Sequence, residues 1–371
     1  MHIVMKPIMA GAVVALAMTS AALAQDTISI GVMVPTTGSE ATYGQDMANA
    51  VQMAQEEINA GGGVLGKKLT MVVGDDACDP QQSVNAATKL VSQGVVAVVG
   101  GYCSGATLPT LKIYGDAKIP FVITAANSTK LIPANPGSAF MINSTGADQA
   151  TKVVEFLGSK GAKSLAIVDE GDAYSQDLAN LTKADWTKAG NTVSAAETVN
   201  KGEQDYSAIV TSIKAAGPDA VFWTAYYADG GLLVRQLRQA GYQGLIIVGD
   251  GSTSVKIFDI AGKAADGIFA ISSPTAEFLP AAADFAKKYK EEFKTEPGPY
   301  APLTYDGMQL LASAMTTAGS TDSAAVIDAL AKASGKEWLT GPISFTPDKT
   351  LARSNFVVVE GKDGGWVRAE K

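Results

Sequence analysis

The sequence predicts an α/β protein built from two doubly wound, parallel-sheet lobes. The first observation is the stretch 95–107, where a short β-branched run ends in Gly100-Gly101 before a helical pattern begins. Such a run indicates a strand buried on both faces, as in parallel sheets. The second is a strand–helix alternation that pauses at 133–146 and then restarts. The third is length, because 371 residues exceed what one hydrophobic core supports, even without a leader.

Residues 1–24 predict a secretory signal peptide. Lys6 precedes an apolar stretch that is too short to span a membrane, and Ala22-Leu23-Ala24 before Gln25 is typical of a cleavage site. No cysteine follows the apolar stretch, so we expect no lipid anchor. We therefore expect a periplasmic protein that begins near Gln25 and does not insert directly into a membrane.

The first series of elements covers residues 27–124. Alternating and then fully apolar residues predict its strands, and helical spacing such as Met47, Val51, Ala54 and Ile58 predicts its helices. The expected strands are 27–34, 69–74, 95–99 and 119–124, and the expected helices are 45–60, 80–93 and 107–117. At 36–43 we expect a polar loop that contains a glycine.

The second series begins after 133–146, a stretch rich in Pro, Gly, Asn and Ser that predicts a crossing between the lobes. Expected strands are 164–169, 192–198, 220–225 and 245–249, and expected helices are 147–159, 175–189, 206–215 and 230–240. A return crossing is expected at 272–274. After it we expect helices at 281–293, 305–318 and 322–334, and strands near 343–345 and 355–359.

Composition and charge exclude several function classes. A formal net charge of −8 argues against nucleic acid or an anionic membrane as a partner. The single histidine, His2, lies in the predicted leader, so a Ser-His-Asp triad and a zinc-protease motif are both excluded from the mature chain. We expect no metal, no cofactor and no enzymatic activity.

Two motifs that suggest chemistry fail on their context. The glycines of 61–67 follow a predicted helix and precede a strand, which is the reverse of a phosphate-binding loop, and Lys68 stands where Ser or Thr must bind magnesium. This segment indicates a helix stop and a turn. The adjacent acids Asp75 and Asp76 have the chemistry for acid–base work, but loop acids more often cap helices or face solvent.

Cys78 and Cys103 are an even pair of cysteines in an exported chain, which predicts one disulfide. The bond closes a loop of roughly 25 residues and contributes about 3 kcal/mol by the chain-entropy estimate. The alternative, a metal bound by two thiolates, lacks any further soft ligand.

The turn at Gly100–Ser104 predicts a small anion site. Unpaired N–H groups at the start of the following helix point into the turn, and Ser104 adds a hydroxyl. The alternative is an ordinary strand–helix connection in which Ser104 caps the helix. Further polar and aromatic residues also follow predicted strands, where open α/β sheets bind ligands. They are Tyr43, Tyr102 and 125–128 in the first series, and Asp169, Glu170, Tyr174, Tyr226, Tyr227 and Asp250 in the second.

At these residues the chain resembles the periplasmic leucine/isoleucine/valine-binding proteins, the type I solute receptors of ABC importers. The markers are the run Asp75–Pro80, Cys103-Ser104, Tyr43-Gly44 and Gly341–Ile343, and the similarity covers essentially the whole mature chain. The resemblance implies a monomer that partners with an inner-membrane ABC permease. It also implies three hinge crossings, near 145, 273 and 353. Lobe 1 is then 25–145 and 274–353, and lobe 2 is 146–273 and 354–371.

The resemblance also implies a ligand site for a free amino acid. Ser104, Ala125 and Asn127 match positions that take the ligand carboxylate, although the family has Thr where this chain has Asn127. Asp250 matches the acid, usually Glu, that pairs with the ligand ammonium. Tyr226 matches a tyrosine that contacts the ligand from the second lobe. The side-chain wall is formed by Tyr43, Tyr102, Tyr174 and Tyr300.

Leucine, isoleucine or valine is the ligand that the resemblance implies. Related receptors bind urea, short amides or aromatic acids, and the ligand-sensing component of a signalling system shares the fold. These remain alternatives, as does a secreted hydrolase, for which the chain offers no nucleophile–base pair.

Overall fold

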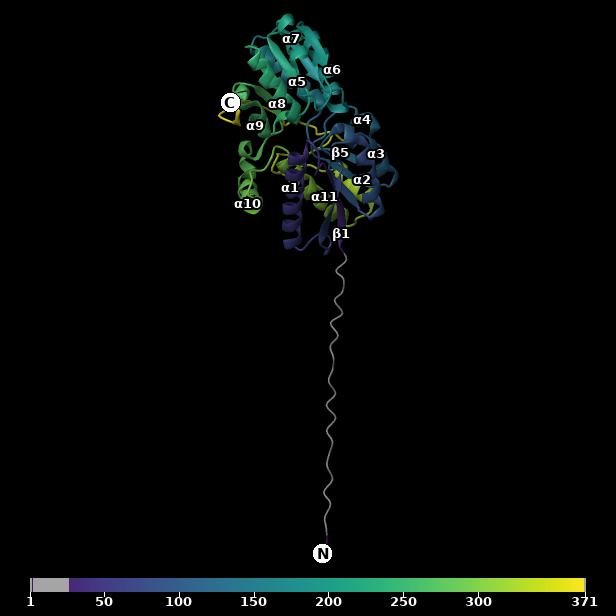
Figure 1. Ribbon diagram of the computed structural model, residues 1–371. Coiled ribbons are helices and arrows are strands. Elements are labelled where there is room, and N and C mark those ends of the chain that lie inside the picture. Colours follow the sequence, from purple (N-terminus) through teal and green to yellow (C-terminus); the bar gives the residue numbers. More distant parts are fainter. Residues whose placement is uncertain (1, 3–26, 370–371) are drawn as a thin grey trace.

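The computed structural model describes residue 2 and residues 27–369. Apart from His2, the predicted signal peptide therefore lies outside the described residues. Two lobes stack on each other, with α1, α2, α3 and α11 in one and α5, α6, α7 and α8 in the other (Figure 1). Within the described part of the chain, no helix is long and apolar enough to cross a membrane.

The first lobe is built on a five-stranded sheet in the order β2-β1-β3-β4-β5, with every pair parallel. Its strands are β1 Ile28–Val34, β2 Leu69–Asp75, β3 Ala97–Gly100, β4 Phe121–Ile123 and β5 Ala139–Met141. The helices of this lobe are α1 Ala41–Ala60, α2 Pro80–Ser92, α3 Ser104–Asp116, α4 Leu131–Ala134, α10 Ala283–Phe293, α11 Ala301–Ala318 and α12 Ser323–Ala331.

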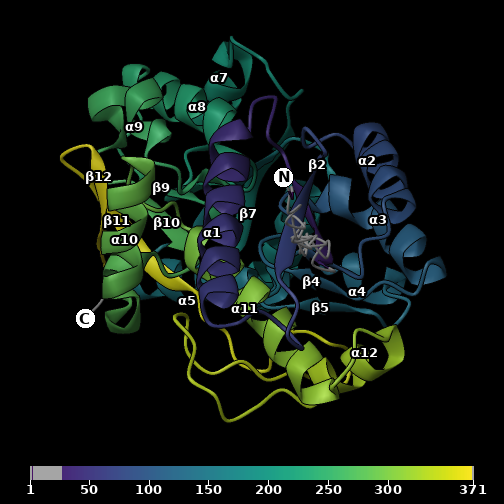
Figure 2. The same ribbon diagram turned by 90° about the horizontal axis from the view of Figure 1, so that it is seen from below.

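Both faces of this sheet are buried, which explains why its strands are continuous apolar runs. Along β1, Val32 and Val34 pack into one hydrophobic cluster with residues of α1 and α11, while Met33 points into a second cluster with residues of α2 and α3. In β3, Val99 likewise belongs to the first cluster and Val98 to the second. Figure 2 shows α1 and α11 together on one side of the strands, and α2 and α3 on the other.

The second lobe is built on a seven-stranded sheet in the order β12-β11-β10-β9-β8-β6-β7. Its strands are β6 Ser164–Asp169, β7 Thr192–Thr198, β8 Ala220–Trp223, β9 Leu245–Val248, β10 Phe269–Ser272, β11 Val357–Lys362 and β12 Gly365–Arg368. Its helices are α5 Gly146–Ser159, α6 Ala173–Lys188, α7 Ser207–Ala216, α8 Tyr227–Gln239 and α9 Lys256–Ala261. In Figure 1, α5 and α6 lie side by side, as do α8 and α9.

The structure confirms the α/β class and the two sheets, and it corrects several elements. Strand β11 pairs antiparallel with β10 and with β12, so one edge of the second sheet is not parallel. Strand β5 lies inside the stretch predicted as a crossing, and β10, β12 and α9 were not predicted. Near 343–345 there is only an isolated bridge between Phe345 and Leu351, because this segment turns back on itself instead of joining a sheet.

The chain passes between the two sheets three times, and the three passages are hydrogen-bonded to one another. Ser144 Oγ donates to Asn355 Oδ1 at 2.6 Å, and the Asn355 N–H donates back to Ser144 Oγ at 2.7 Å. Ser273 Oγ donates to Asn143 Oδ1 at 2.8 Å. The lobe boundaries implied by the resemblance fall close to these contacts and remain a prediction.

Three carboxyl groups buried in the first lobe predict that the protein is more stable in mild acid. Burial raises the pKa of Asp46 and of Asp76 to about 7 and that of Asp306 to about 6, from an ordinary value of 3.8. Between pH 4 and pH 7 the folded state therefore binds more protons than the unfolded state, so the free energy of unfolding falls as pH rises through this window.

We expect the thermal midpoint, measured by calorimetry, to be higher at pH 5.5 than at pH 7.5. Asp76→Asn should reduce this difference in midpoint, because asparagine does not titrate. The asparagine oxygen can still accept the Cys78 N–H, which lies 2.8 Å from Asp76 Oδ1 in the unmodified protein. A midpoint that rises from pH 5.5 to pH 7.5 would contradict this assignment.

Candidate functional site

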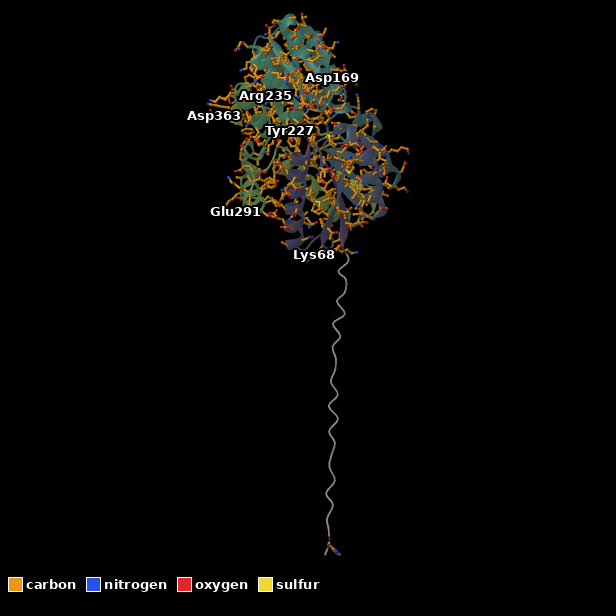
Figure 3. The ribbon with its side chains drawn as sticks, in the orientation of Figure 1. Lys68, Asp169, Tyr227, Arg235, Glu291 and Asp363 are labelled. Atoms are coloured by element: carbon orange, nitrogen blue, oxygen red, sulfur yellow. A yellow bond between two sulfur atoms is a disulfide. The ribbon has the colours of Figure 1, made fainter. Side chains whose placement is uncertain are left out.

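The carboxyl ends of the central strands of the two sheets face each other across one cleft. Tyr102 and Ser104 follow β3, Ala125 and Asn127 follow β4, and Asp250 follows β9. Contacts across the cleft hold the lobes together: the Tyr227 hydroxyl donates to the Ser39 carbonyl at 2.7 Å, and Figure 3 labels Tyr227 at this junction. Ligands of open α/β sheets bind at such strand ends.

A small cavity in this cleft brings together eight of the nine predicted ligand residues. It is lined by Tyr102, Ser104, Ala125, Asn127, Tyr174, Tyr226, Asp250, Gly251 and Tyr300. Its volume of about 10 Å³ is the room that one water molecule occupies. The tyrosine rings thus fill the cleft, and a molecule larger than water enters only when these rings or the two lobes move apart.

The turn after β3 places Ser104 at the start of α3. Gly100 has a φ of +119°, and a Cβ on it would lie 2.3 Å from the Met33 carbonyl oxygen, so only glycine fits. The helix begins at Ser104 and not near 107, and Cys103 occupies the N-cap position. Ser104 is therefore the first helical residue and not a cap, which corrects the alternative of an ordinary serine cap.

The Ser104 side chain lies where it can donate to an anion. Its Oγ accepts the N–H groups of Asn127 and Ser128, each at 3.2 Å. With two donors already on the oxygen, the hydroxyl hydrogen is left for a further acceptor. An α-helix leaves its first N–H groups without an acceptor inside the helix, and Ser104 is the first residue of α3. Ser104 and this helix start offer donors, which is the chemistry that an anion requires.

Asp250 supplies the opposite charge, and its side chain is 2% exposed. The Tyr174 hydroxyl donates to its Oδ1 at 2.7 Å, and the side-chain amides of Asn127 and Asn143 donate to its Oδ2 at 3.0 and 3.3 Å. Burial raises its pKa, and the hydrogen bonds of Tyr174 and Asn143 oppose that shift. All these donors are neutral, and no Lys or Arg among the described residues forms an ion pair with Asp250.

Asn127 lies between the Ser104 end and the Asp250 end of the site. Its backbone N–H donates to Ser104, while its side-chain amide reaches across the cleft to Asp250. Its Oδ1 has no hydrogen-bond partner among the described residues. The structure therefore places the side-chain amide on the Asp250 side, and not beside Ser104 where a ligand carboxylate is expected.

Tyrosine rings from both lobes form the rest of the wall. Tyr102 and Tyr300 have ring centroids 5.4 Å apart, and Tyr174 and Tyr226 lie 5.5 Å apart. Tyr43 does not line the cavity. Its ring packs against two tyrosines that do: the ring centroids of Tyr43 and Tyr102 are 4.9 Å apart, and those of Tyr43 and Tyr300 are 5.3 Å apart. It lies in the first turn of α1, which starts at Ala41, so the predicted loop is shorter than expected. Burial raises the pKa of these tyrosines, so they remain neutral.

Sequence reasoning missed Asn143, Gln149 and Gly251. Asn143 lies on the first crossing and contacts Asp250, and a hydrogen bond from Gln149 in α5 also lowers the Asp250 pKa. The composition of 133–146 predicted the crossing between the lobes, but nothing in it indicated that Asn143 contacts a residue of the cleft. Gly251 was hidden because it contributes only backbone to the cavity.

The glycine-rich segment is a helix stop and a turn, as predicted, and the loop acids have structural roles, but neither of them caps a helix and Asp76 is buried instead of facing solvent. Asp75 Oδ1 accepts the N–H groups of Thr36 and Ala77, and Asp76 Oδ1 accepts that of Cys78. The segment after α1 forms a turn closed by mutual Val64 and Lys67 backbone hydrogen bonds. The Cys78–Cys103 disulfide is present, with Cα atoms 5.4 Å apart. Among the described residues, no group of three or more His, Cys, Asp or Glu side chains could hold a metal ion.

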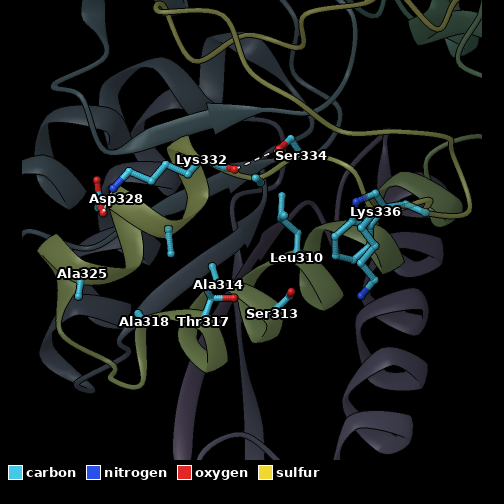
Figure 4. A pocket seen from close by; sticks show the side chains of 13 residues that line it. Leu310, Ser313, Ala314, Thr317, Ala318, Ala325, Asp328, Lys332, Ser334 and Lys336 are labelled. Atoms are coloured by element: carbon cyan, nitrogen blue, oxygen red, sulfur yellow. Dashed lines mark hydrogen bonds and ion pairs between the residues drawn. The ribbon is translucent and has the colours of Figure 1, made fainter.

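A larger hollow of about 520 Å³ lies away from the cleft, between α11, α12 and the loop that ends at Trp338 (Figure 4). Short side chains line much of it, Lys332 pairs with Asp328 at 2.7 Å, and the Lys336 Nζ lies 4.0 Å from the centre of the Trp338 ring. All its lining residues lie between 310 and 338, so it does not join the lobes.

Comparison with known proteins agrees with the fold. A family model described as "Periplasmic binding protein" matches residues 27–365. A Leu/Ile/Val-binding protein homolog of Brucella abortus is 32% identical over 91% of this chain and 92% of its own length. A leucine-binding protein of Thermotoga maritima has a TM-score of 0.87 at 26% identity, covering 92% of this chain and 98% of its own.

The branched-chain amino acid transporter substrate-binding protein of Streptococcus pneumoniae, solved with isoleucine, has a TM-score of 0.83 at 28% identity and covers 92% of this chain and 100% of its own. These structures share the two-lobed, type I fold described above. The chain belongs to the periplasmic binding protein family.

Proposed function

We propose that this protein is the solute receptor of an ABC importer and binds a free L-amino acid between its lobes. The observation that carries the proposal is Asp250, a buried carboxylate held only by neutral donors. Buried charges in proteins are normally paired, so a ligand ammonium is the partner that this site favours. An acid without an ammonium would place a second negative charge beside Asp250.

The spacing of the site supports an α-amino acid. The Ser104 end and the Asp250 end are bridged by a single residue, Asn127, whose backbone N–H contacts one and whose side-chain amide contacts the other. The ammonium and carboxylate of an α-amino acid are attached to one carbon atom, so a short ligand reaches both ends. The ring wall then covers its side chain, and closure of the hinge excludes water and strengthens both charged contacts.

Leucine, isoleucine and valine are the first ligands to test, because the relatives carry these names. An inner-membrane permease is the expected partner, and the periplasm the expected compartment. Pull-down of either a permease or a sensor kinase distinguishes an importer from a signalling receptor.

The test is calorimetric titration of refolded, ligand-stripped protein against the twenty amino acids, urea and benzoate. 4-Methylpentanoate, which is leucine without its ammonium, is the matched control. We expect one-to-one binding of at least one L-amino acid and much weaker binding of ligands that lack the ammonium. Heat from urea or benzoate alone would overturn the proposal.

Ser104→Ala is expected to weaken binding of the preferred amino acid roughly ten- to 150-fold, since a hydrogen bond to a charged group contributes about 1.5–3 kcal/mol and two backbone N–H groups lose their acceptor. Calorimetry measures the loss. Ser83→Ala is the control, because Ser83 is equally buried but donates to the Pro80 carbonyl in α2, away from the cleft. Equal affinity of Ser104→Ala and the unmodified protein would remove this hydroxyl from the site.

A further inference from the structure

Another buried carboxyl group, Glu40, contacts Tyr102, one of the tyrosines that line the small cavity. Glu40 directly precedes α1 and is fully buried. The Tyr102 hydroxyl donates to its Oε2 at 3.2 Å, while its Oε1 has no hydrogen-bond partner among the described residues. A buried carboxylate oxygen without a partner is costly, so its position calls for a donor.

Glu40 lines a second cavity of about 330 Å³ between the lobes. Ser39 and Glu40 line it from the first lobe, and Lys201, Gly202, Tyr226 and Asp229 are among those that line it from the second. Tyr226 lines this cavity and the small one beside Asp250, so this residue lies between the two. The Tyr102 and Tyr226 ring centroids are 5.9 Å apart, so Tyr102, which binds Glu40, is a neighbour of the residue that the two cavities share.

The lining of the second cavity holds more carboxyl groups than cations. Its lining holds two carboxyl groups, Glu40 and Asp229, and one cation, Lys201. The Lys201 ammonium lies 5.1 Å from the centre of the Tyr226 ring and makes no ion pair with a described residue. Burial raises the pKa of Glu40 to about 7, against the opposing charge of Lys201. A side chain that enters therefore meets an acceptor-rich surface.

We infer that the second cavity receives the side chain of the bound amino acid, and that Glu40 selects side chains that end in N–H donors. This inference rests on the proposed function, because the ligand must first be anchored at Ser104 and Asp250. The ligands of this class are long L-amino acids with an amide or cationic end, such as glutamine, lysine and arginine. An aliphatic side chain of the same length leaves Glu40 Oε1 without a partner.

Glutamine and methionine provide a matched pair of probes, because their unbranched side chains have similar length and only glutamine carries N–H donors. Titration of the full, ligand-stripped protein should show glutamine or arginine binding at least tenfold more tightly than methionine. Glu40→Met should lower the affinity for glutamine and arginine at least tenfold, and leave methionine unchanged or tighter. Glu40→Gln, which keeps an acceptor for Tyr102, should weaken arginine more than glutamine.

The outcomes distinguish a failure of the inference on Glu40 from a failure of the proposed amino-acid receptor. If methionine or leucine binds more tightly than glutamine and arginine in the unmodified protein, the inference on Glu40 is wrong and the amino-acid receptor stands. A loss of affinity that is equal for all ligands in both Glu40 variants also refutes selection by this residue. If no amino acid binds, the proposed function fails and the inference fails with it. Circular dichroism of both variants verifies that they are folded.

Discussion

Asp250→Asn is expected to weaken binding of the preferred L-amino acid at least tenfold. Removal of one member of a buried charge pair is expensive, since the remaining ammonium loses its partner in a site from which water is excluded. Asparagine keeps one oxygen for the Tyr174 hydroxyl, which lies 2.7 Å from Asp250 Oδ1, but presents an N–H₂ group to the side-chain amide of Asn127. Calorimetric titration at constant pH measures the change, and a tenfold loss corresponds to about 1.4 kcal/mol.

A second measurement on Asp250→Asn distinguishes loss of the Asp250 charge from a failure of the two lobes to close. The ratio of the affinities for leucine and 4-methylpentanoate should fall towards one, because only the ammonium of leucine distinguishes the two at Asp250. Asp177→Asn is the matched control. Asp177 is also a buried carboxylate of the second lobe, and its Oδ2 accepts the Ser128 hydroxyl at 2.8 Å and the Thr129 N–H at 2.6 Å across the cleft. Asp177→Asn should therefore change the affinities for leucine and for 4-methylpentanoate by the same factor. Unchanged affinity in Asp250→Asn would exclude Asp250 from the site.

Much of the fold was predictable because this architecture leaves a strong local signal. A parallel strand buried on both faces must be apolar at every position, so β3 and β4 stand out in the sequence. The antiparallel edge is marked only in part. Val357–Val359 predicts the start of β11, but the strand continues through Glu360 and Lys362, and β12 carries no apolar run and is defined by its pairing with β11. The short β5 was missed because it has only three residues, too few to show an alternating pattern, and Pro, Gly and Asn residues flank it.

The site was predictable where a residue type marks the end of a strand, as Ser104 and Asp250 do. Residues that act through their neighbours were not. Asn143 reaches Asp250 from a crossing, and Glu40 reaches the cleft only because α1 begins four residues earlier than helical spacing suggests. The burial of Glu40 depends on both lobes, so no single segment of the chain predicts it.

Loss of the disulfide is expected to produce the largest fall in stability. The bond ties the loop after β2 to Cys103, the N-cap position of α3, across 25 residues. By the chain-entropy estimate it contributes about 3 kcal/mol, which for a chain of this size lowers the thermal midpoint by roughly 4 °C. The double variant Cys78→Ser, Cys103→Ser should show this decrease by calorimetry.

The matched control is the unmodified protein in excess reductant, which should reproduce the decrease, while reductant should leave the double variant unchanged. Because Cys103 directly precedes Ser104, the variant also tests whether the bond positions the carboxylate site. At 25 °C, well below its midpoint, the folded double variant should bind the preferred amino acid a few-fold more weakly, since α3 still begins after Gly100-Gly101. A midpoint within 1 °C of the unmodified protein would show that the packing of α3 against α2, and not the disulfide, holds this corner of the cleft.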